Sequence, residues 1–309
     1  MSIYTIGVDV GGTNIKIGVL DASGQVIARK HFATKLIASS KIKLIDALAH
    51  HILDIIAKAG LKKKQVNGVG IGLPGPIDFK AGIVRFLPNI PGWKNVPLKQ
   101  LLEDRLDVPV FIDNDVKLIT LAEWQMGAGK GFKDLVCLTL GTGVGSGLVL
   151  GGRFYRGAHN AAGELGHLPL NEQGPKCNCG GFGCLESYIG NQPLVTRANE
   201  IMGSSDMSLE KMFGLANKNN TKALMFWKET ATHLGNGLTA VVNLLNPQLI
   251  IIGGGVSNNH KYLFKAAQEV IDTRAMLTHR RKVKIVRAEF GNDAGIIGAQ
   301  VLVNNVKDL

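Results

Sequence analysis

Four side chains of the types that bind zinc lie close together in one stretch of the sequence. His167, Cys177, Cys179 and Cys184 all fall within GHLPLNEQGPKCNCGGFGCLES, residues 166–187. One histidine and three cysteines form a usual ligand set of a closed, tetrahedral, structural zinc site. Because four protein ligands leave no position for a catalytic water, we expect the zinc ion to hold a loop in shape and to take no part in the chemistry.

A disulfide or a redox site is the alternative for these cysteines. A thioredoxin-type site needs C-x-x-C, whereas the spacing here is C-x-C followed by C-x-x-x-x-C. A chain of 309 residues can bury a core without disulfides, and clustered cysteines are not typical of a secreted disulfide framework. The start, MSIYTIGVDVGGTN, has no secretory signal pattern, and no run of about 18 apolar residues occurs. These features predict a cytoplasmic protein without a membrane partner.

Two glutamates flank the candidate zinc ligands. Glu164 lies three residues before His167, and Glu186 lies two residues after Cys184. A lone glutamate is usually a solvated surface group, but two held at the ends of one clamped loop are suited to binding neighbouring hydroxyl groups. This arrangement favours a sugar ligand.

Acidic residues also follow an apolar segment, VPVFIDNDV. Asp113, Asn114 and Asp115 fall at the end of this predicted strand, which is where ligands bind in α/β folds. Phosphoryl transfer to an alcohol needs a carboxylate that accepts the hydroxyl proton. An Asp-Asn-Asp run by itself is more often a turn, so the segment indicates this chemistry only beside a phosphate-binding element.

Glycine-rich turns offer such elements. DVGGTN and LGTGVGSG, residues 9–14 and 140–147, match neither the Walker pattern nor G-x-G-x-x-G, yet their backbone N–H groups are free to bind phosphate. With Thr13, Thr142 and a carboxylate at Asp9 to organise Mg²⁺, the pair predicts a bound nucleotide. A third cluster, IIIGGGVS, fits a tight strand-to-helix turn and the close approach of a purine equally well.

Alternating strands and helices must position these residues. Residues 3–34 predict a three-stranded meander, and KIKLIDALAHHILDIIAKAG predicts an amphipathic helix with Ile42, Ile45, Leu48, Ile52 and Ile55 on its apolar face. From about residue 134 the same plan begins again. We therefore expect two α/β domains, 1–117 and 118–293, with a last helix in 294–309 packing back on the first.

The chain carries a formal net charge of +11. Its basic residues are scattered except for Lys62–Lys64 and the THRRKVK run, residues 278–284, and no aromatic residues interleave with them. This pattern favours solvated faces and predicts no nucleic-acid partner, while an anionic substrate stays compatible.

Together the motifs resemble the ROK family (repressor, open reading frame, kinase) of the actin-like and hexokinase-like superfamily. The resemblance spans nearly the whole chain and includes GVDVGGTNIKIGV, GIGLPGPID, PNIPGWKNVPL, LTLGTGVGSGLVLGG, GAHNAAGELGH, CNCGGFGCLES and LNPQLIIIGGGVS. It implies a two-domain α/β fold of the actin-like, hexokinase-like (ribonuclease H-like) type with a ligand cleft between the domains. It also implies an ATP- and Mg²⁺-dependent sugar kinase that forms a homodimer.

The resemblance assigns roles residue by residue. Asp115 is the catalytic base, and Asn114 is its sugar-binding neighbour. The remaining sugar contacts are Gly75, Asn89, Glu164, His167 and Glu186, with His167 also a zinc ligand. The nucleotide contacts are Asp9, Gly11, Gly12, Thr13, Asn14 and Lys16 in the first turn, Thr142 and Gly143 in the second, and Gly254 and Gly255 on the adenosine side.

Two residues depart from the family pattern. Lys117 follows the Asn-Asp pair where small residues are usual, and Ser146 replaces a frequent glycine. Lys117 lies behind the catalytic residue and is expected to alter packing or the entrance, and Ser146 is harmless if its φ is negative. Neither change is expected to abolish activity.

The substrate is the open part of this interpretation. PNIPGWKNVPL and LTLGTGVG are most similar to the glucokinases of the family, which predicts transfer of the γ-phosphoryl group of ATP to the 6-hydroxyl of glucose. Kinases for N-acylmannosamine, N-acetylglucosamine, mannose or fructose share the same core. A non-catalytic sugar-sensing regulator is the alternative from another class, although the first phosphate element begins at Gly7 and leaves no room for the DNA-binding module of the family's repressors.

Overall fold

The computed structural model describes residues 3–34, 40–87, 92–280 and 282–305 and divides into two compact units. Unit 1 comprises Met1–Gly127, Gly157–Ala161 and Asn292–Leu309, and unit 2 comprises Ala128–Arg156 and Ala162–Gly291. The boundary expected after residue 117 falls inside helix α3 (Asp115–Gln125), which lies wholly in unit 1.

Unit 1 is built on a mixed sheet with the strand order β3-β2-β1-β4-β8. The predicted meander is present as β1 (Tyr4–Val10), β2 (Asn14–Leu20) and β3 (Val26–Ala33), which pair antiparallel. Strand β4 (Val66–Leu73) pairs in parallel with β1, and β8 (Val110–Asn114) pairs in parallel with β4. A smaller sheet consists of β5 (Ile77–Asp78), β6 (Ile83–Phe86) and β7 (Lys94–Val96).

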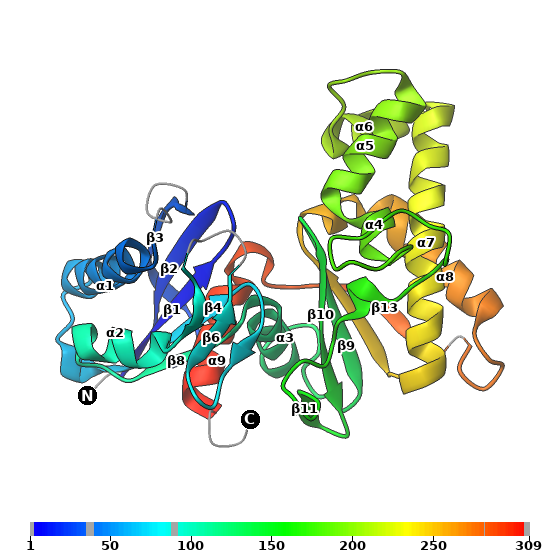
Figure 1. The fold of residues 1–309 in the computed structure, drawn as a ribbon. Coiled ribbons are helices and arrows are strands. Elements are labelled where there is room, and N and C mark those ends of the chain that lie inside the picture. Colours follow the sequence, from blue (N-terminus) through cyan, green and yellow to red (C-terminus); the bar gives the residue numbers. More distant parts are fainter. Residues whose placement is uncertain (1–2, 35–39, 88–91, 281, 306–309) are drawn as a thin grey trace. The chain divides into compact units, whose positions relative to one another are not determined.

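Helices cover both faces of the larger sheet (Figure 1). Helices α1 (Lys41–Lys58) and α2 (Leu98–Leu106) lie on one face, and α3 and α9 (Ala294–Asn305) lie on the other. The Ser40 hydroxyl caps α1 by accepting the Lys43 N–H, and the predicted apolar face is buried except for Ile42, which is 62% exposed. Ile42 lies in the first turn of α1, before the buried residues of this helix begin with Leu44.

Unit 2 repeats the plan with the strand order β11-β10-β9-β12-β13, which confirms the doubled architecture expected from the sequence. Its strands are β9 (Leu135–Leu140), β10 (Val144–Leu150), β11 (Arg153–Tyr155), β12 (Leu249–Gly253) and β13 (Lys284–Arg287). Its helices are α4 (Glu186–Ile189), α5 (Asn191–Met202), α6 (Leu209–Asn217), α7 (Thr221–Leu245) and α8 (His260–Arg274). Unit 2 also contains the 3₁₀ turns η3 (Leu165–His167) and η4 (Gly255–Asn259). The turn η2 (Lys63–Gln65) lies in unit 1, and η5 (Gly291–Asp293) lies where the chain passes from unit 2 to unit 1.

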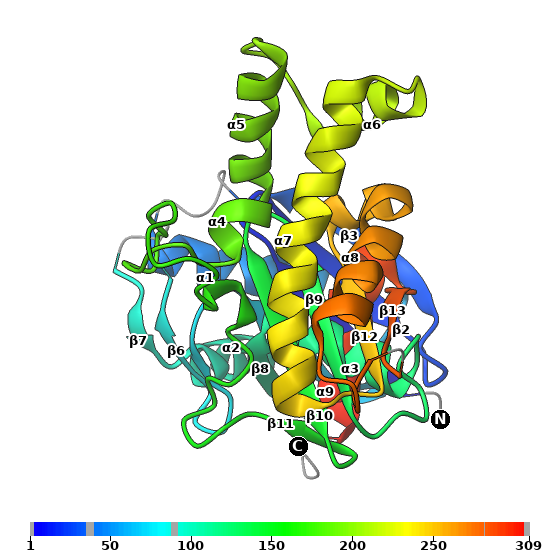
Figure 2. The same ribbon diagram turned by 90° about the vertical axis from the view of Figure 1, so that its right-hand side faces the viewer.

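The long helix α7 joins two parts of unit 2. Its C-terminal half packs beside α8, and its N-terminal half extends past the sheet together with α5 and α6 (Figure 2). Asn220 caps its start by accepting the Ala223 N–H, and Asn246 ends it with φ of +47°. Helices α5 and α7 line part of a cavity described below.

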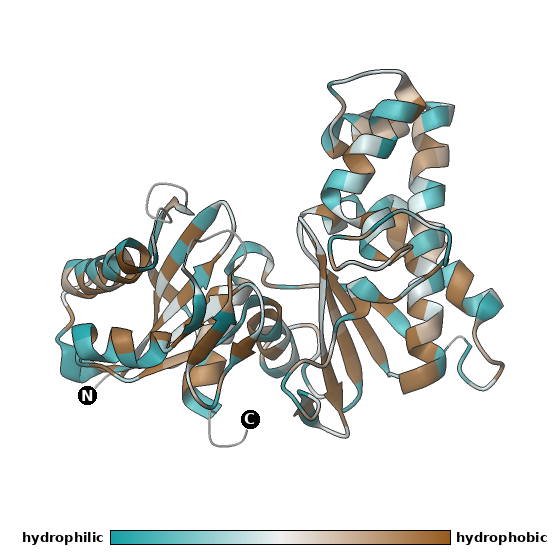
Figure 3. Ribbon diagram, in the orientation of Figure 1, coloured by the Kyte–Doolittle hydropathy of each residue, from teal (hydrophilic) through white to brown (hydrophobic). Residues whose placement is uncertain are grey.

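Apolar residues are concentrated in the strands of both sheets and on the helix faces that pack against them (Figure 3). Each unit therefore has its own core, as two domains of this size require. In the part of the chain that the structure describes, no helix is both long and apolar enough to cross a bilayer.

Helix α9 lies unusually close to the backbone of its neighbours. A Cβ atom at Gly7 of β1 would overlap the Ile296 carbonyl, and one at Gly70 of β4 would overlap the Ala299 carbonyl. On the opposite side, a Cβ at Gly298 would overlap the Leu118 carbonyl of α3. The glycines at these positions let α9 pack against β1, β4 and α3 at once.

This packing predicts a large cost for Gly298→Ala. The added methyl group meets backbone of α3, which cannot rotate away, so we expect the melting temperature to fall by about 5–10 °C in calorimetry. Gly214→Ala in α6 is the matched control, since nothing lies within 4 Å of its Cβ position, and it should leave the melting temperature unchanged or raise it slightly. Equal melting temperatures for both variants would contradict the close contact.

Candidate functional site

The Asp-Asn-Asp run forms the junction between β8 and α3 of unit 1. Asn114 caps α3, because its Oδ1 accepts the N–H groups of Val116 at 3.0 Å and Lys117 at 3.2 Å. Its Nδ2 donates to the carbonyl of Gly75 at 3.2 Å. The Asn114 amide therefore links the start of α3 to the Gly-Pro loop and holds Asp115 at the first position of the helix.

Asp115 is half-buried at this helix start. Burial and, secondly, the negative charge of Asp9 raise the pKa of the Asp115 carboxyl to about 6, although the Val116 N–H donates to it at 2.9 Å. A carboxyl group whose pKa lies near neutrality is suited to accept a proton in catalysis.

Asp9 ends β1 and is the second carboxylate of this region. Burial raises its pKa, and the Lys16 ammonium, 3.7 Å away, partly offsets the effect. Its Cγ lies against the first turn of α9, where a Cβ at Gly295 would come within 2.8 Å. Two neighbouring carboxylates with raised pKa values form a site that gains from a cation, and oxygen ligands of this kind suit Mg²⁺.

The first glycine turn connects β1 to β2 beside Asp9. Gly12 and Thr13 are exposed, and the turn is closed by a hydrogen bond from the Gly11 N–H to the Asn14 carbonyl at 3.0 Å. Thr34, the residue after β3, supports the turn, since its hydroxyl donates to the Gly11 carbonyl at 2.7 Å. The structure therefore brings Asp9, the first turn and Asp115 together in unit 1.

The Gly-Pro loop supplies one more predicted contact. Gly75 has φ of +88°, which favours glycine, and a Cβ there would lie 2.8 Å from the Phe86 carbonyl. Its predicted companion, Asn89, lies outside the described residues.

Unit 2 holds the second glycine turn between β9 and β10. The Gly141 N–H donates to the Gly143 carbonyl at 2.9 Å, and the Asn191 N–H donates to the Gly141 carbonyl at 2.9 Å. Oε2 of Glu186 accepts the Val144 N–H at 2.8 Å and fills the space that a Cβ at Gly143 would need. One oxygen of this predicted sugar contact is thus already engaged with the turn that carries Thr142.

The four candidate zinc ligands converge as the sequence predicted. Their ligand atoms all lie within 4.8 Å of one another; Cys179 Sγ is 3.7 Å from Cys184 Sγ, and Cys177 Sγ is 3.6 Å from His167 Nδ1. Tetrahedral zinc with Zn–S bonds of about 2.3 Å places neighbouring sulfurs about 3.8 Å apart, so the donor set fits. Burial, then the neighbouring thiols, raise the pKa of Cys184 to about 12, and a thiolate there needs a cation close by.

The third glycine cluster has a structural reason of its own. Gly254 follows β12 with φ of +87°, and a Cβ there would overlap the Leu140 carbonyl of β9. The Ser257 hydroxyl donates to the Gly254 carbonyl at 2.7 Å and closes the turn into η4. Packing alone therefore accounts for Gly254, while nothing lies within 4 Å of a Cβ at Gly255.

A cavity of about 610 Å³ in unit 2 adjoins several of these residues. Thr142, Cys177 and Glu186 line it together with residues of α5 and α7.

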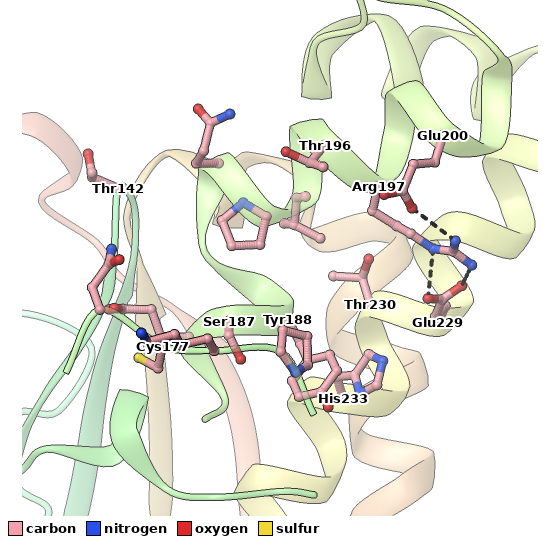
Figure 4. A pocket seen from close by; sticks show the side chains of 17 residues that line it. Thr142, Cys177, Ser187, Tyr188, Thr196, Arg197, Glu200, Glu229, Thr230 and His233 are labelled. Atoms are coloured by element: carbon pink, nitrogen blue, oxygen red, sulfur yellow. Dashed lines mark hydrogen bonds and ion pairs between the residues drawn. The ribbon is translucent and has the colours of Figure 1, made fainter. Parts of the chain in front are cut away.

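Figure 4 shows Arg197 of α5 reaching Glu229 of α7, with Thr142 at the opposite end. Glu200 also accepts from Arg197, and Tyr188 stacks on His233 with ring centroids 4.3 Å apart. No sequence motif marked Arg197 or Glu229, because the two residues are 32 positions apart and meet only through helix packing.

Lys117 has a clear structural role. Its side chain is 7% exposed, and its ammonium donates to the carbonyl of Asn160, which has φ of +59°. The contact fastens residues 157–161 to α3 within unit 1. Lys117 therefore alters packing, one of the two effects expected from the sequence.

Comparison with known proteins gives one consistent family. A sequence profile described as "ROK family" matches residues 5–306. A glucokinase of Thermotoga maritima is 33% identical over 96% of both chains. A xylose repressor of Caldicellulosiruptor bescii is 29% identical over 96% of this chain and 77% of its own length.

Solved structures agree with this result. A ROK hexokinase from Thermus thermophilus superposes with a TM-score of 0.83 at 34% identity, with complete coverage of both chains. A ROK family glucokinase from Streptomyces griseus, in complex with glucose and AMPPNP, gives a TM-score of 0.81 at 31% identity over 98% of this chain and 99% of that one. These neighbours confirm the two-domain, actin-like α/β fold expected from the sequence.

Proposed function

This chain belongs to the ROK family, and we propose that it is an ATP-dependent hexokinase whose substrate is D-glucose. In the proposed reaction the 6-hydroxyl oxygen of glucose forms a bond to the γ-phosphorus of ATP, and the bond from that phosphorus to the β–γ bridging oxygen breaks. Glucose 6-phosphate and ADP are the products. Relatives described as glucokinases that match nearly the full chain support this choice of sugar.

The environment of Asp115 is the observation that carries the proposal. Its carboxyl group is half-buried at the start of α3, and burial with the Asp9 charge raises its pKa to about 6. The group is therefore largely ionised at neutral pH yet basic enough to accept the hydroxyl proton as the phosphoryl group arrives. Asp115 acts as the general base.

The nucleotide is held by backbone N–H groups and a cation. We assign its phosphates to Gly11, Gly12, Thr13, Asn14 and Lys16 of the first turn and to Thr142 and Gly143 of the second, and its adenosine to Gly254 and Gly255. Asp9 is placed to hold Mg²⁺, which neutralises charge on the phosphates when bound. The exposure of Gly12 and Thr13 supports this role.

We assign the sugar contacts residue by residue from the family motifs. They are Gly75, Asn89, Asn114, Glu164, His167 and Glu186. The Asn114 amide and one Glu186 oxygen are engaged with backbone groups, so these two residues also fix the shape of the site. Zinc on His167, Cys177, Cys179 and Cys184 holds the loop between Glu164 and Glu186 and has no position left for catalysis.

A homodimer in the cytoplasm completes the proposal. The dimer rests on the family resemblance, and the cytoplasmic location rests on the cysteine usage and the composition of the chain.

A panel of sugars tests the substrate directly. With ATP and Mg²⁺, kcat/KM is measured for glucose, mannose, fructose, N-acetylglucosamine and N-acetylmannosamine, and glucose should give the highest value. A higher value for another sugar would reassign the substrate within the kinases. Sugar binding without ADP release above background, for every sugar, would favour a non-catalytic regulator of the kind found among the repressor relatives.

Replacing the proposed base tests the mechanism. Asp115→Asn should lower kcat by about 10²–10⁴-fold, while calorimetry finds glucose affinity nearly unchanged, because positioning survives the loss of the base. In the wild type, kcat should fall as the pH drops below about 6, where the Asp115 carboxyl becomes protonated. Asp46→Asn, an exposed carboxylate of α1, is the control and should keep normal turnover. A near-normal kcat for Asp115→Asn would remove Asp115 from this role.

Asp115→Asn is also expected to raise the melting temperature by an amount that depends on pH. The folded-state pKa of Asp115 lies above its value in the unfolded chain, so the ionised carboxyl costs stability increasingly as the pH rises from about 4 to about 6. Asp115→Asn should therefore raise the melting temperature more at pH 8 than at pH 5.

Removing one zinc ligand tests the link between the metal and the sugar. Cys179 is the exposed ligand, so Cys179→Ser disturbs the packing least. We expect zinc content, measured by mass spectrometry, to fall from one ion per chain to near zero, and KM for glucose to rise at least about tenfold. Cys137→Ala, at the cysteine outside the cluster, should keep its zinc. A zinc-free variant with unchanged KM would separate the metal from the pocket.

A further inference from the structure

The turn that carries Glu164 and His167 rests directly on the backbone of β10. A Cβ at Gly163 would lie 2.6 Å from the Ser146 carbonyl oxygen, and a Cβ at Gly166 would overlap the Val144 carbonyl. Gly163 also has φ of +97°, a conformation that favours glycine. The turn therefore has no layer of side chains between itself and the strand.

Ser146 supplies the one side chain that bonds to this turn from β10. It is 5% exposed; its hydroxyl donates to the Gly163 carbonyl and accepts the Leu165 N–H at 3.3 Å. These two backbone groups lie on either side of Glu164. A single buried hydroxyl thus fixes both peptide units that set the direction of the Glu164 side chain.

Glu164 depends on that support because its own side chain is exposed. Packing by neighbouring side chains contributes little to its direction, so the backbone at residues 163–165 decides where the carboxylate points. A glycine or an alanine at position 146 offers no hydroxyl and cannot make either hydrogen bond.

We propose that Ser146 is a positioning residue for sugar binding that acts through Glu164. The inference rests on the proposed function, in which Glu164 contacts the sugar. Loss of the hydroxyl leaves the partly buried Gly163 carbonyl and Leu165 N–H without this partner and lets the turn relax. Affinity for the sugar falls, whereas phosphoryl transfer, which depends on Asp115, is left intact.

Three variants at this position test the proposal. Ser146→Ala and Ser146→Gly remove the hydroxyl, and Ser146→Thr keeps it. Two different variants without the hydroxyl are used so that misfolding of one does not leave the test open. We expect KM for glucose to rise roughly tenfold in the alanine and glycine variants, the factor that the loss of about one hydrogen bond represents. KM for ATP and kcat should stay within about twofold of the wild-type values in these variants. Ser146→Thr, which keeps the hydroxyl, should have the wild-type KM for glucose.

A double-mutant cycle shows whether the effect passes through Glu164. Adding Ser146→Ala to a Glu164→Gln variant should change the glucose KM little, because the group that Ser146 orients has already been altered. Thr239→Ala, which removes another half-buried hydroxyl of unit 2 bonded to a backbone carbonyl, is the control and should leave KM unchanged.

The outcomes separate this inference from the proposed function. An unchanged glucose KM in folded Ser146→Ala and Ser146→Gly, with only a lower melting temperature, would make Ser146 merely structural and overturn the proposal. Equal rises in the KM values for glucose and ATP, or full additivity with Glu164→Gln, would overturn it as well. A wild type that phosphorylates no sugar would instead refute the proposed function, and the cycle is run with whichever sugar the wild type prefers.

Discussion

The close approach of α9 to its surroundings is the constraint on which unit 1 depends. Gly7, Gly70 and Gly298 bring the helix into backbone contact with β1, β4 and α3. Its first turn lies against the Asp9 carboxylate, and its middle lies against the helix that begins with Asp115. The first turn of α9 thus contributes to the burial that raises the pKa of Asp9. Burial of Asp115 itself and the nearby Asp9 charge raise the pKa of the candidate base.

In unit 2, the loop of residues 171–183 has little apolar surface to bury. Residues 171–183 are mostly polar or glycine, and the ligand atoms of three cysteines and one histidine converge at this loop. Glu186, two residues after Cys184, accepts the Val144 N–H at the end of the second glycine turn. The Cys₃His cluster is thereby linked, through the single intervening residue Leu185, to the turn assigned to the nucleotide. The Cys₃His cluster, Glu186 and the second glycine turn of this unit are therefore connected.

Glycine illustrates why sequence motifs and their physical causes need separate examination. The sequence favoured phosphate binding for the glycine-rich turns, and the exposed Gly12 is compatible with that role. Gly254, however, is also required by packing, because the Leu140 carbonyl occupies the space of a side chain, and at Gly143 the Glu186 carboxylate lies where a Cβ would be. A glycine in such a turn records a close approach, and the sequence does not say whether the approaching group is a ligand or the protein itself.

Local patterns allowed the sequence by itself to determine the α/β class, the repeated plan, helix α1 and the Cys₃His set, because periodicity and ligand spacing are written in neighbouring residues. Family motifs likewise marked Asp115 as the candidate base. Tertiary structure alone decided the raised pKa of Asp115, the engagement of Glu186 with Val144, the Arg197–Glu229 pair and the support that Ser146 gives to residues 163–165. Each of these depends on groups that are distant in sequence and meet only when strands and helices pack, and burial, unlike periodicity, is a property of the whole fold.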